Sequence, residues 1–235
     1  MLAKGSCLHT ELKSLLGKLQ FVCNIIPAGR CFLRRLHNLS CGPRSARRPI
    51  LLPQDARADL ELWSQFLADF NGRCLLSFGT PFTSAELNLQ ADASKYGYGA
   101  TFGSKFIQGV FPPEWSSRDI QSLELYPIAA VLSLFAPRLS GSSILIRSDN
   151  LPIVHALNNH TSRNKDVMAI LRPLVLCLMR AQIRVKAVHV RGTDNTVCDR
   201  LSRQQATPAF LANHGLDPHP TLLPPHLLPG NFAEW

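Results

Sequence analysis

Residues 189–203 read HVRGTDNTVCDRLSR and lead from the end of a strand into a helix. The residues just before, 183–190, alternate between apolar and polar side chains, which is typical of a half-buried strand. His189 lies at the end of that pattern, and a flexible Arg-Gly-Thr link follows it. The stretch therefore predicts a strand, a short link and a helix over 194–204 in immediate succession.

The predicted helix begins with polar residues that could cap it. Asp194 and Asn195 are both typical N-cap residues, because their side-chain oxygens accept hydrogen bonds from the amides of the first turn. Asp199 lies one turn into the helix, ten residues after His189. A carboxylate near a helix start is thus expected close to an imidazole at a strand end.

Further upstream, the chain has the alternation of an antiparallel meander. Residues 87–92 alternate Leu, Leu and Ala with Asn, Gln and Asp, and two more strands are predicted over 96–103 and 105–111. Three positions of the second strand carry little or no side chain: Gly97, Gly99 and Ala100. Another backbone could approach closely there, although a bulge would explain the glycines equally well.

Helices and strands alternate between this meander and the stretch that opened the analysis. The predicted elements are a helix over 119–136, a strand over 143–148, and helices over 151–158 and 166–181. The complete order is β-β-β-α-β-α-α-β-α. It predicts an α/β fold in which helices flank a five-stranded mixed sheet.

Four acidic residues occupy positions that this order would bring together. They lie on the first strand, near the start of the first long helix, at the end of the fourth strand and in the last helix: Asp92, Glu124, Asp149 and Asp199. None has a Lys or Arg at an obvious pairing position in its own element. Because clustered carboxylates are unfavourable without a cation, the set predicts two Mg²⁺ ions about 3.5–4 Å apart, which Mn²⁺ could replace. For any one acid alone, a surface or capping role is the simpler explanation.

His189 is the candidate for proton transfer beside this site. An imidazole next to a metal site can shuttle protons or assist a leaving group. A strand-end histidine without any chemical role is the alternative.

The first part of the chain is helical and locally basic. Helices are predicted over 8–26, 29–39 and 55–69, the last ending at Asn71-Gly72. Residues 28–50 contain six arginines and no acid: Arg30, Arg34, Arg35, Arg44, Arg47 and Arg48. This segment could bind phosphates, or it could be a solvated charged face.

The composition favours a soluble intracellular protein with a polyanionic partner. The net charge is +9, and no apolar stretch reaches the roughly 18–20 residues that span a bilayer. The amino terminus lacks the apolar region of a signal peptide. Seven cysteines show no zinc-ligand spacing. Residues 206–235 contain six prolines and no periodic pattern, which predicts a tail or linker.

Four strings of the sequence resemble the RNase H domain of retroelement polyproteins: ADAS around Asp92, LELYPIAAV around Glu124, SDN at 148–150, and HVRGTDNTVCDRLSR at 189–203. The resemblance implies a ribonuclease H-like domain over 85–205 that cuts the RNA of RNA–DNA hybrids. It implies metal-binding catalytic roles for the four acids named above and an auxiliary role for His189. It also implies weaker contacts to the hybrid from Asn150 and Ser94.

The flanking segments extend this resemblance. LKSLLGKLQFVCNIIPAGRCFLRRL is similar to the thumb and connection that follow a reverse transcriptase palm, and DARADLELWSQFLADFNG to the stretch before RNase H. LDPHPTLLPPHLL is similar to the linker after RNase H in DIRS-like retrotransposons, which carry a tyrosine recombinase. The implied organisation is a helical thumb/connection-like segment over 1–80, the RNase H-like domain, and a Pro-rich tail over 206–235. No YxDD aspartate pair or palm sequence is present, so we expect a piece of a polyprotein without polymerase activity.

Two other hypotheses compete with the nuclease. Pro127 and Pro173 fall within predicted helices, and an interior proline destabilises a helix by about 3 kcal/mol. Pro127 is tolerated if its helix starts near Ser122. Pro173 has no such tolerated position. The two prolines and the missing polymerase leave a second hypothesis, an inactive retroelement remnant that only binds nucleic acid. A DDE-type transposase or integrase also binds metal ions through a set of acidic residues. The four acids and the HVRG…CDRLSR string argue against this third hypothesis.

Overall fold

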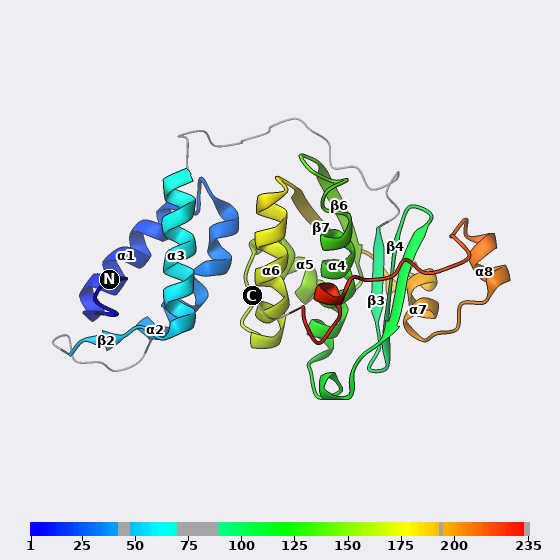
Figure 1. Ribbon diagram of the computed structural model, residues 1–235, viewed down its shortest axis with the longest axis horizontal. Helices are drawn as coiled ribbons and strands as arrows, with labels where there is room; N and C mark the ends of the chain where they lie inside the picture. Colours follow the sequence, from blue (N-terminus) through cyan, green and yellow to red (C-terminus); the bar gives the residue numbers. More distant parts are fainter. Residues whose placement is uncertain (42–47, 70–88, 193–194, 233–235) are drawn as a thin grey trace. The chain divides into compact units, whose positions relative to one another are not determined.

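The computed structural model describes residues 1–41, 48–69, 89–192 and 195–232. The chain divides into two compact units (Figure 1). One comprises Met1–Phe78 with Asn159–Thr161, and the other comprises Gly79–Asn158 with Ser162–Trp235. Within the described residues, no helix has both the length and the apolar character needed to cross a membrane.

The first unit is helical, as its sequence predicts. It contains α1 (His9–Val22), the 3-10 helix η1 (Pro27–Phe32), α2 (Arg34–Ser40) and α3 (Gln54–Asp69), together with the antiparallel pair β1 (Ser6–Cys7) and β2 (Ile50–Leu51). The helix predicted over 29–39 begins later, at Arg34, because the preceding residues adopt the tighter 3-10 geometry after Pro27. The predicted end of the third helix at Asn71-Gly72 lies outside the described residues.

The second unit is built on the predicted five-stranded mixed sheet. Its strands are β3 (Gln90–Ala93), β4 (Gly97–Phe102), β5 (Lys105–Val110), β6 (Ser143–Ser148) and β7 (Arg184–His189). Their order is β5-β4-β3-β6-β7: the first three form an antiparallel meander, and β6 and β7 run parallel to β3. The structure confirms the predicted α/β fold, in which helices flank a five-stranded mixed sheet.

Helices cover both faces of this sheet (Figure 1). On one face lie α4 (Ile120–Phe135), α5 (Leu151–Asn159) and α6 (Lys165–Arg180), and α4 packs on β3, β4 and α6. On the other face α7 (Thr196–Ser202) packs on β3, β4 and β5. Because β3 lies between α4 and α7, its side chains can meet groups from both helices.

Neither interior proline interrupts its helix. Asp119 caps α4 by accepting the amide of Gln121 at 2.8 Å, so the helix starts earlier than Ser122 and Pro127 lies in its interior. The prediction that Pro127 is tolerated because its helix starts near Ser122 is therefore wrong. Pro173 likewise lies within α6. Both proline side chains are buried, and burial of the two helices in the core offsets the missing amide donors.

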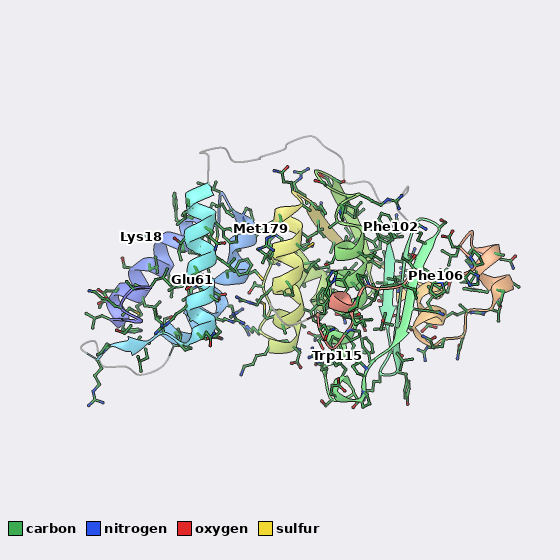
Figure 2. The ribbon with its side chains drawn as sticks, viewed as in Figure 1. Lys18, Glu61, Phe102, Phe106, Trp115 and Met179 are labelled. Atoms are coloured by element: carbon green, nitrogen blue, oxygen red, sulfur yellow. The ribbon has the colours of Figure 1, made fainter. Side chains whose placement is uncertain are left out.

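The Pro-rich segment after residue 205 is ordered and packs on this unit, although its sequence predicts a tail. It forms α8 (Pro208–Asn213) and the 3-10 turn η4 (Pro225–Leu227). Phe106 of β5 forms a buried apolar cluster with residues of α7 and of this segment: Leu201, Leu211 and Leu216 (Figure 2). Tyr126 of α4 donates its hydroxyl to the carbonyl of Leu227 at 2.8 Å.

Candidate functional site

Close packing of α7 on the sheet positions the first acid. Ser202 at the end of α7 donates its hydroxyl to Asp92 Oδ2 at 2.8 Å. Two glycines of β4 allow this approach. A Cβ on Gly99 would lie 2.4 Å from Leu201 Cβ, and one on Gly97 would lie 2.7 Å from the carbonyl oxygen of Ser202. The predicted close backbone approach at these glycines is thereby confirmed.

Asn195 fixes the start of α7 to the strand that carries Asp92. It occupies the N-cap position, as predicted, but its side chain makes no capping hydrogen bond. Instead its Nδ2 donates to the backbone carbonyl of Ala91 at 2.9 Å, and the residue is buried. The other predicted cap, Asp194, lies outside the described residues. Asn195 and Ser202 therefore hold both ends of α7 against β3.

Asp149 follows directly after β6, beside His189 at the end of β7. The Nε2 of His189 lies 3.1 Å from the backbone carbonyl oxygen of Asp149, and its ring is exposed. Gly192 passes close to the acid: a Cβ at that position would lie 3.1 Å from Asp149 Oδ2. The predicted imidazole therefore contacts the backbone of the residue that carries the third carboxylate.

Glu124 reaches the same region from α4. The side chain of Asn150, the residue after Asp149, is near enough to lower the pKa of the Glu124 carboxyl. Asn150 also accepts the amide of Ile153 on its Oδ1 at 3.2 Å, which fixes it at the start of α5. The structure therefore gives Asn150 a role in orienting Glu124, in addition to the hybrid contact that the sequence suggests.

The acids influence one another electrostatically. Burial raises the pKa of Asp92 to about 6, the hydrogen bond from Ser202 opposes this shift, and the charges of Asp149 and Asp199 add to it. Burial likewise raises the pKa of Glu124 to about 7, against the effect of Asn150 and with the charges of Asp149 and Asp92. The structure therefore brings the four predicted carboxylates into one electrostatically coupled cluster.

One of the acids has a cationic partner in its own helix, contrary to the expectation from the sequence. Arg203 Nε lies 2.8 Å from Asp199 Oδ1. The two residues are four apart, a spacing that places side chains on one face of a helix. Both side chains are about half exposed, at 49% for Asp199 and 54% for Arg203, so water weakens this ion pair.

The oxygen donors of the cluster suit Mg²⁺, although the acids do not surround a single position. Among the described residues, no three His, Cys, Asp or Glu side chains converge closely enough to hold a metal ion by themselves. Mg²⁺ prefers oxygen ligands and is usually held by one or two carboxylates together with water and substrate phosphates, rather than by an all-protein cage. Mutual repulsion of buried carboxylates also favours binding of a cation.

The other predicted nucleic-acid contacts have different surroundings. Ser94 accepts the amides of Tyr96 and Gly97 and so stabilises the β3–β4 turn. The arginines of the basic segment belong to the helical unit, where Arg35 forms ion pairs with Asp55 and Asp59 at 3.3 and 3.4 Å. Arg30 and Arg34 are half-buried and Arg48 is exposed, whereas Arg44 and Arg47 lie outside the described residues.

Comparison with solved structures finds several chains that match this one. The chain is similar to RNase H1 from the halophilic archaeon Halobacterium salinarum NRC-1, with 14% sequence identity and a TM-score of 0.37. The similarity covers 50% of this chain and 92% of that one. No protein-family model matches the sequence, and no curated protein matches it at a significant level.

Proposed function

We propose that the second unit is a metal-dependent endoribonuclease that cuts the RNA strand of RNA–DNA hybrids. The observation that supports this most is the coupled set of Asp92, Glu124, Asp149 and Asp199, presented by β3, α4, the end of β6 and α7. These residues would hold two Mg²⁺ ions, which Mn²⁺ could replace. When bound, the ions supply a more acidic water and neutralise charge on the scissile phosphate.

The side chains around the acids have supporting roles in this proposal. Ser202 and Asn150 orient Asp92 and Glu124 and stabilise their ionised forms, because each lowers the pKa that burial raises. The exposed ring of His189 is available to carry a proton to the departing 3′-oxygen. Water attack at phosphorus with loss of that oxygen would leave a 5′-phosphate and a 3′-hydroxyl.

The proposal extends to the origin of the chain. The resemblance of its flanks supports an RNase H-like domain over 85–205, with a thumb/connection-like segment over 1–80 and a C-terminal segment over 206–235. Such an arrangement would derive from a DIRS-like retroelement polyprotein. We expect no DNA synthesis in a primer-extension assay, because the sequence lacks a YxDD pair.

A cleavage assay tests the nuclease directly. The substrate is a hybrid with a 5′-labelled RNA strand, incubated with the purified protein and Mg²⁺. Wild-type protein should give RNA fragments that disappear with a chelator, and Asp149→Asn, purified in parallel, should give none. Equal cleavage by both proteins would show a contaminating nuclease, and absence of cleavage by both would refute the proposal.

The ion pair between Asp199 and Arg203 favours a second candidate, an inactive protein that only binds nucleic acid. An arginine that neutralises one acid competes with a cation for it. Salt-dependent binding of the hybrid without any Mg²⁺-dependent hydrolysis would support this candidate. If neither the hybrid nor duplex DNA binds at low salt, the second candidate is wrong as well.

A further inference from the structure

The α7-bearing face of the sheet is exposed where it extends over β6 and β7. On the opposite face of these strands, Ile144, Ile146 and Ala187 are buried. On the α7-bearing face, Arg147 and Lys186 are exposed. The two strands therefore present one face to the core and the other to solvent.

The strand register identifies which side chains share this exposed face. Parallel partners point to the same side of a sheet, and so do residues two apart in one strand. Ser143 pairs with Arg184, Leu145 with Lys186, and Arg147 with Val188. A contact verifies the assignment: the guanidinium of Arg184 donates to Ser143 Oγ through Nε at 3.0 Å and Nη2 at 2.6 Å.

Three of these six side chains are basic and none is acidic. Arg147, Arg184 and Lys186 form what we call the basic strip. Arg184 and Lys186 lie about 6.6 Å apart along β7, since a strand rises about 3.3 Å per residue. Arg184 is held in place by the hydrogen bonds that it donates to Ser143 Oγ, and Arg147 extends the strip onto β6.

The basic strip leads to the carboxylate cluster. Arg147 is the parallel partner of Gln90, and Gln90 lies two residues before Asp92 on β3. Arg147 and Gln90 also line a small cavity of about 60 Å³ together with Val190 and Asn195, the residue that anchors α7. The strip and Asp92 thus lie on one face of the sheet, with α7 beside them.

We infer that the basic strip binds the phosphate backbone of a nucleic-acid strand that extends away from the carboxylate site. The inference rests on the proposed function and assigns a further part of its binding surface. Regularly spaced phosphates complement a row of cations, and each phosphate contact releases counterions. The carboxylates at one end of the face repel phosphates, so the strip holds the strand where the cluster alone could not.

Binding in a chelator tests the strip without any need for turnover. The measurement is the fluorescence anisotropy of a labelled RNA–DNA hybrid over a range of salt concentrations. Arg147→Glu/Lys186→Glu should weaken binding by on the order of tenfold or more at about 0.1 M salt, and reduce the salt slope by about 2. Arg147→Gln/Lys186→Gln should show the same trend with a smaller loss.

The matched control is Arg163→Glu/Lys165→Glu, which makes the same change in charge at exposed positions at the start of α6. It should bind with an affinity close to that of the wild type. If both charge reversals weaken binding equally, or if wild-type protein does not bind the hybrid, the inference is wrong. It is also wrong if polyglutamate competes as well as the hybrid, because the strip would then be a general acid-binding surface.

The outcome separates this inference from the nuclease proposal. Strip-dependent binding without hydrolysis would retain the strip and refute the nuclease. Hydrolysis that the strip variants leave unchanged, together with unchanged binding, would retain the nuclease and refute the strip. Thermal unfolding of each variant shows whether it is folded, and the milder Gln pair decides the question if the Glu pair does not fold.

Discussion

At the scale of single residues, Asp92 and Glu124 are held where their negative charge is unfavourable. Burial is the main reason that their pKa values are raised to about 6 and about 7. Carboxylates in this condition bind cations readily, because a cation removes both the desolvation penalty and the mutual repulsion. Binding of Mg²⁺ would therefore neutralise the unfavourable negative charge of the candidate site.

These raised pKa values imply that stability depends on pH in the absence of metal. A carboxyl with a raised pKa in the folded state favours folding fully below its unfolded pKa, and loses this contribution as the pH rises through the folded value. For Glu124 the window runs from the ordinary value of 4.5 to about 7. Glu124→Gln lacks this dependence. As the pH rises from about 4 to about 8, we therefore expect its free energy of unfolding to increase by about 1 kcal/mol relative to that of wild type, allowing for partial exposure.

Urea unfolding of both proteins in a chelator, at about pH 4 and about pH 8, measures this effect. A difference in the free energy of unfolding that does not change with pH would contradict the raised pKa of Glu124.

The sequence predicts the four acids and His189 but not the side chains that orient them. The acids follow from the order of strands and helices, which places them at neighbouring element ends. Ser202 and Asn150 reach the acids only through the packing of α7 on β3 and the position at which α5 begins, and neither of these leaves a period in the sequence. Arg203 could have been predicted, since its spacing of four from Asp199 is visible in the sequence.

At the scale of elements, the fit of α7 against β4 positions Asp199 and Ser202. Gly99 leaves no space for a side chain, since an added Cβ would lie 2.4 Å from Leu201 Cβ and 2.9 Å from the amide nitrogen of Ser202. We expect Gly99→Ala to destabilise the second unit by about 1–3 kcal/mol, because it overpacks a buried contact with backbone. Cleavage of the RNA–DNA hybrid should fall as well, because α7, which carries Asp199, must move away from β4.

The control for this substitution is Gly17→Ala in α1, where an added Cβ meets nothing within 4 Å. Alanine favours the helix over glycine there, so this variant should be as stable as wild type or more so. Equal stability of Gly99→Ala and wild type in urea unfolding would show that α7 does not pack as described.

Strand and helix positions are the part of the fold that the sequence predicts best. The alternation in 183–190 and the apolar spacing of 166–181 reflect burial of one face, which leaves a period in the sequence. The 3-10 turn at Pro27–Phe32 was missed because a proline at a helix start is compatible with either helix type.

At the scale of the whole molecule, the segment after residue 205 completes the second unit. Its backbone amides at Asp217 and Thr221 donate to the carbonyls of Ser104, just before β5, and Phe106 on β5, at 2.8 and 2.7 Å. These bonds cover part of the outer edge of the sheet, which would otherwise be open to pairing with another chain. No periodic pattern marks this segment, because its contacts come from isolated side chains and backbone groups.

Phe232 anchors this segment on the far side of the sheet. It is 2% exposed, and its ring centroid lies 5.7 Å from that of Tyr126 on α4. We expect Phe232→Ala to lower the free energy of unfolding of the second unit by about 3–5 kcal/mol, as for other buried phenylalanines.

The matched control is Leu222→Ala, in the same segment but 85% exposed, which should be nearly neutral. Thermal unfolding of the two variants decides the matter. If Phe232→Ala unfolds at the same temperature as Leu222→Ala, the segment does not contribute to the fold.

The account as a whole depends on the four carboxylates acting together on one substrate. The most direct measurement is the single-turnover rate of RNA cleavage in an RNA–DNA hybrid with Mg²⁺, for wild type and for Asp92→Asn, Glu124→Gln, Asp149→Asn and Asp199→Asn. Asp217→Asn, at a carboxylate paired with Lys105 outside the site, is the control. Each of the four changes should reduce the rate by on the order of 100-fold or more while the control cleaves like wild type; cleavage at the wild-type rate by any one of the four variants would contradict the account.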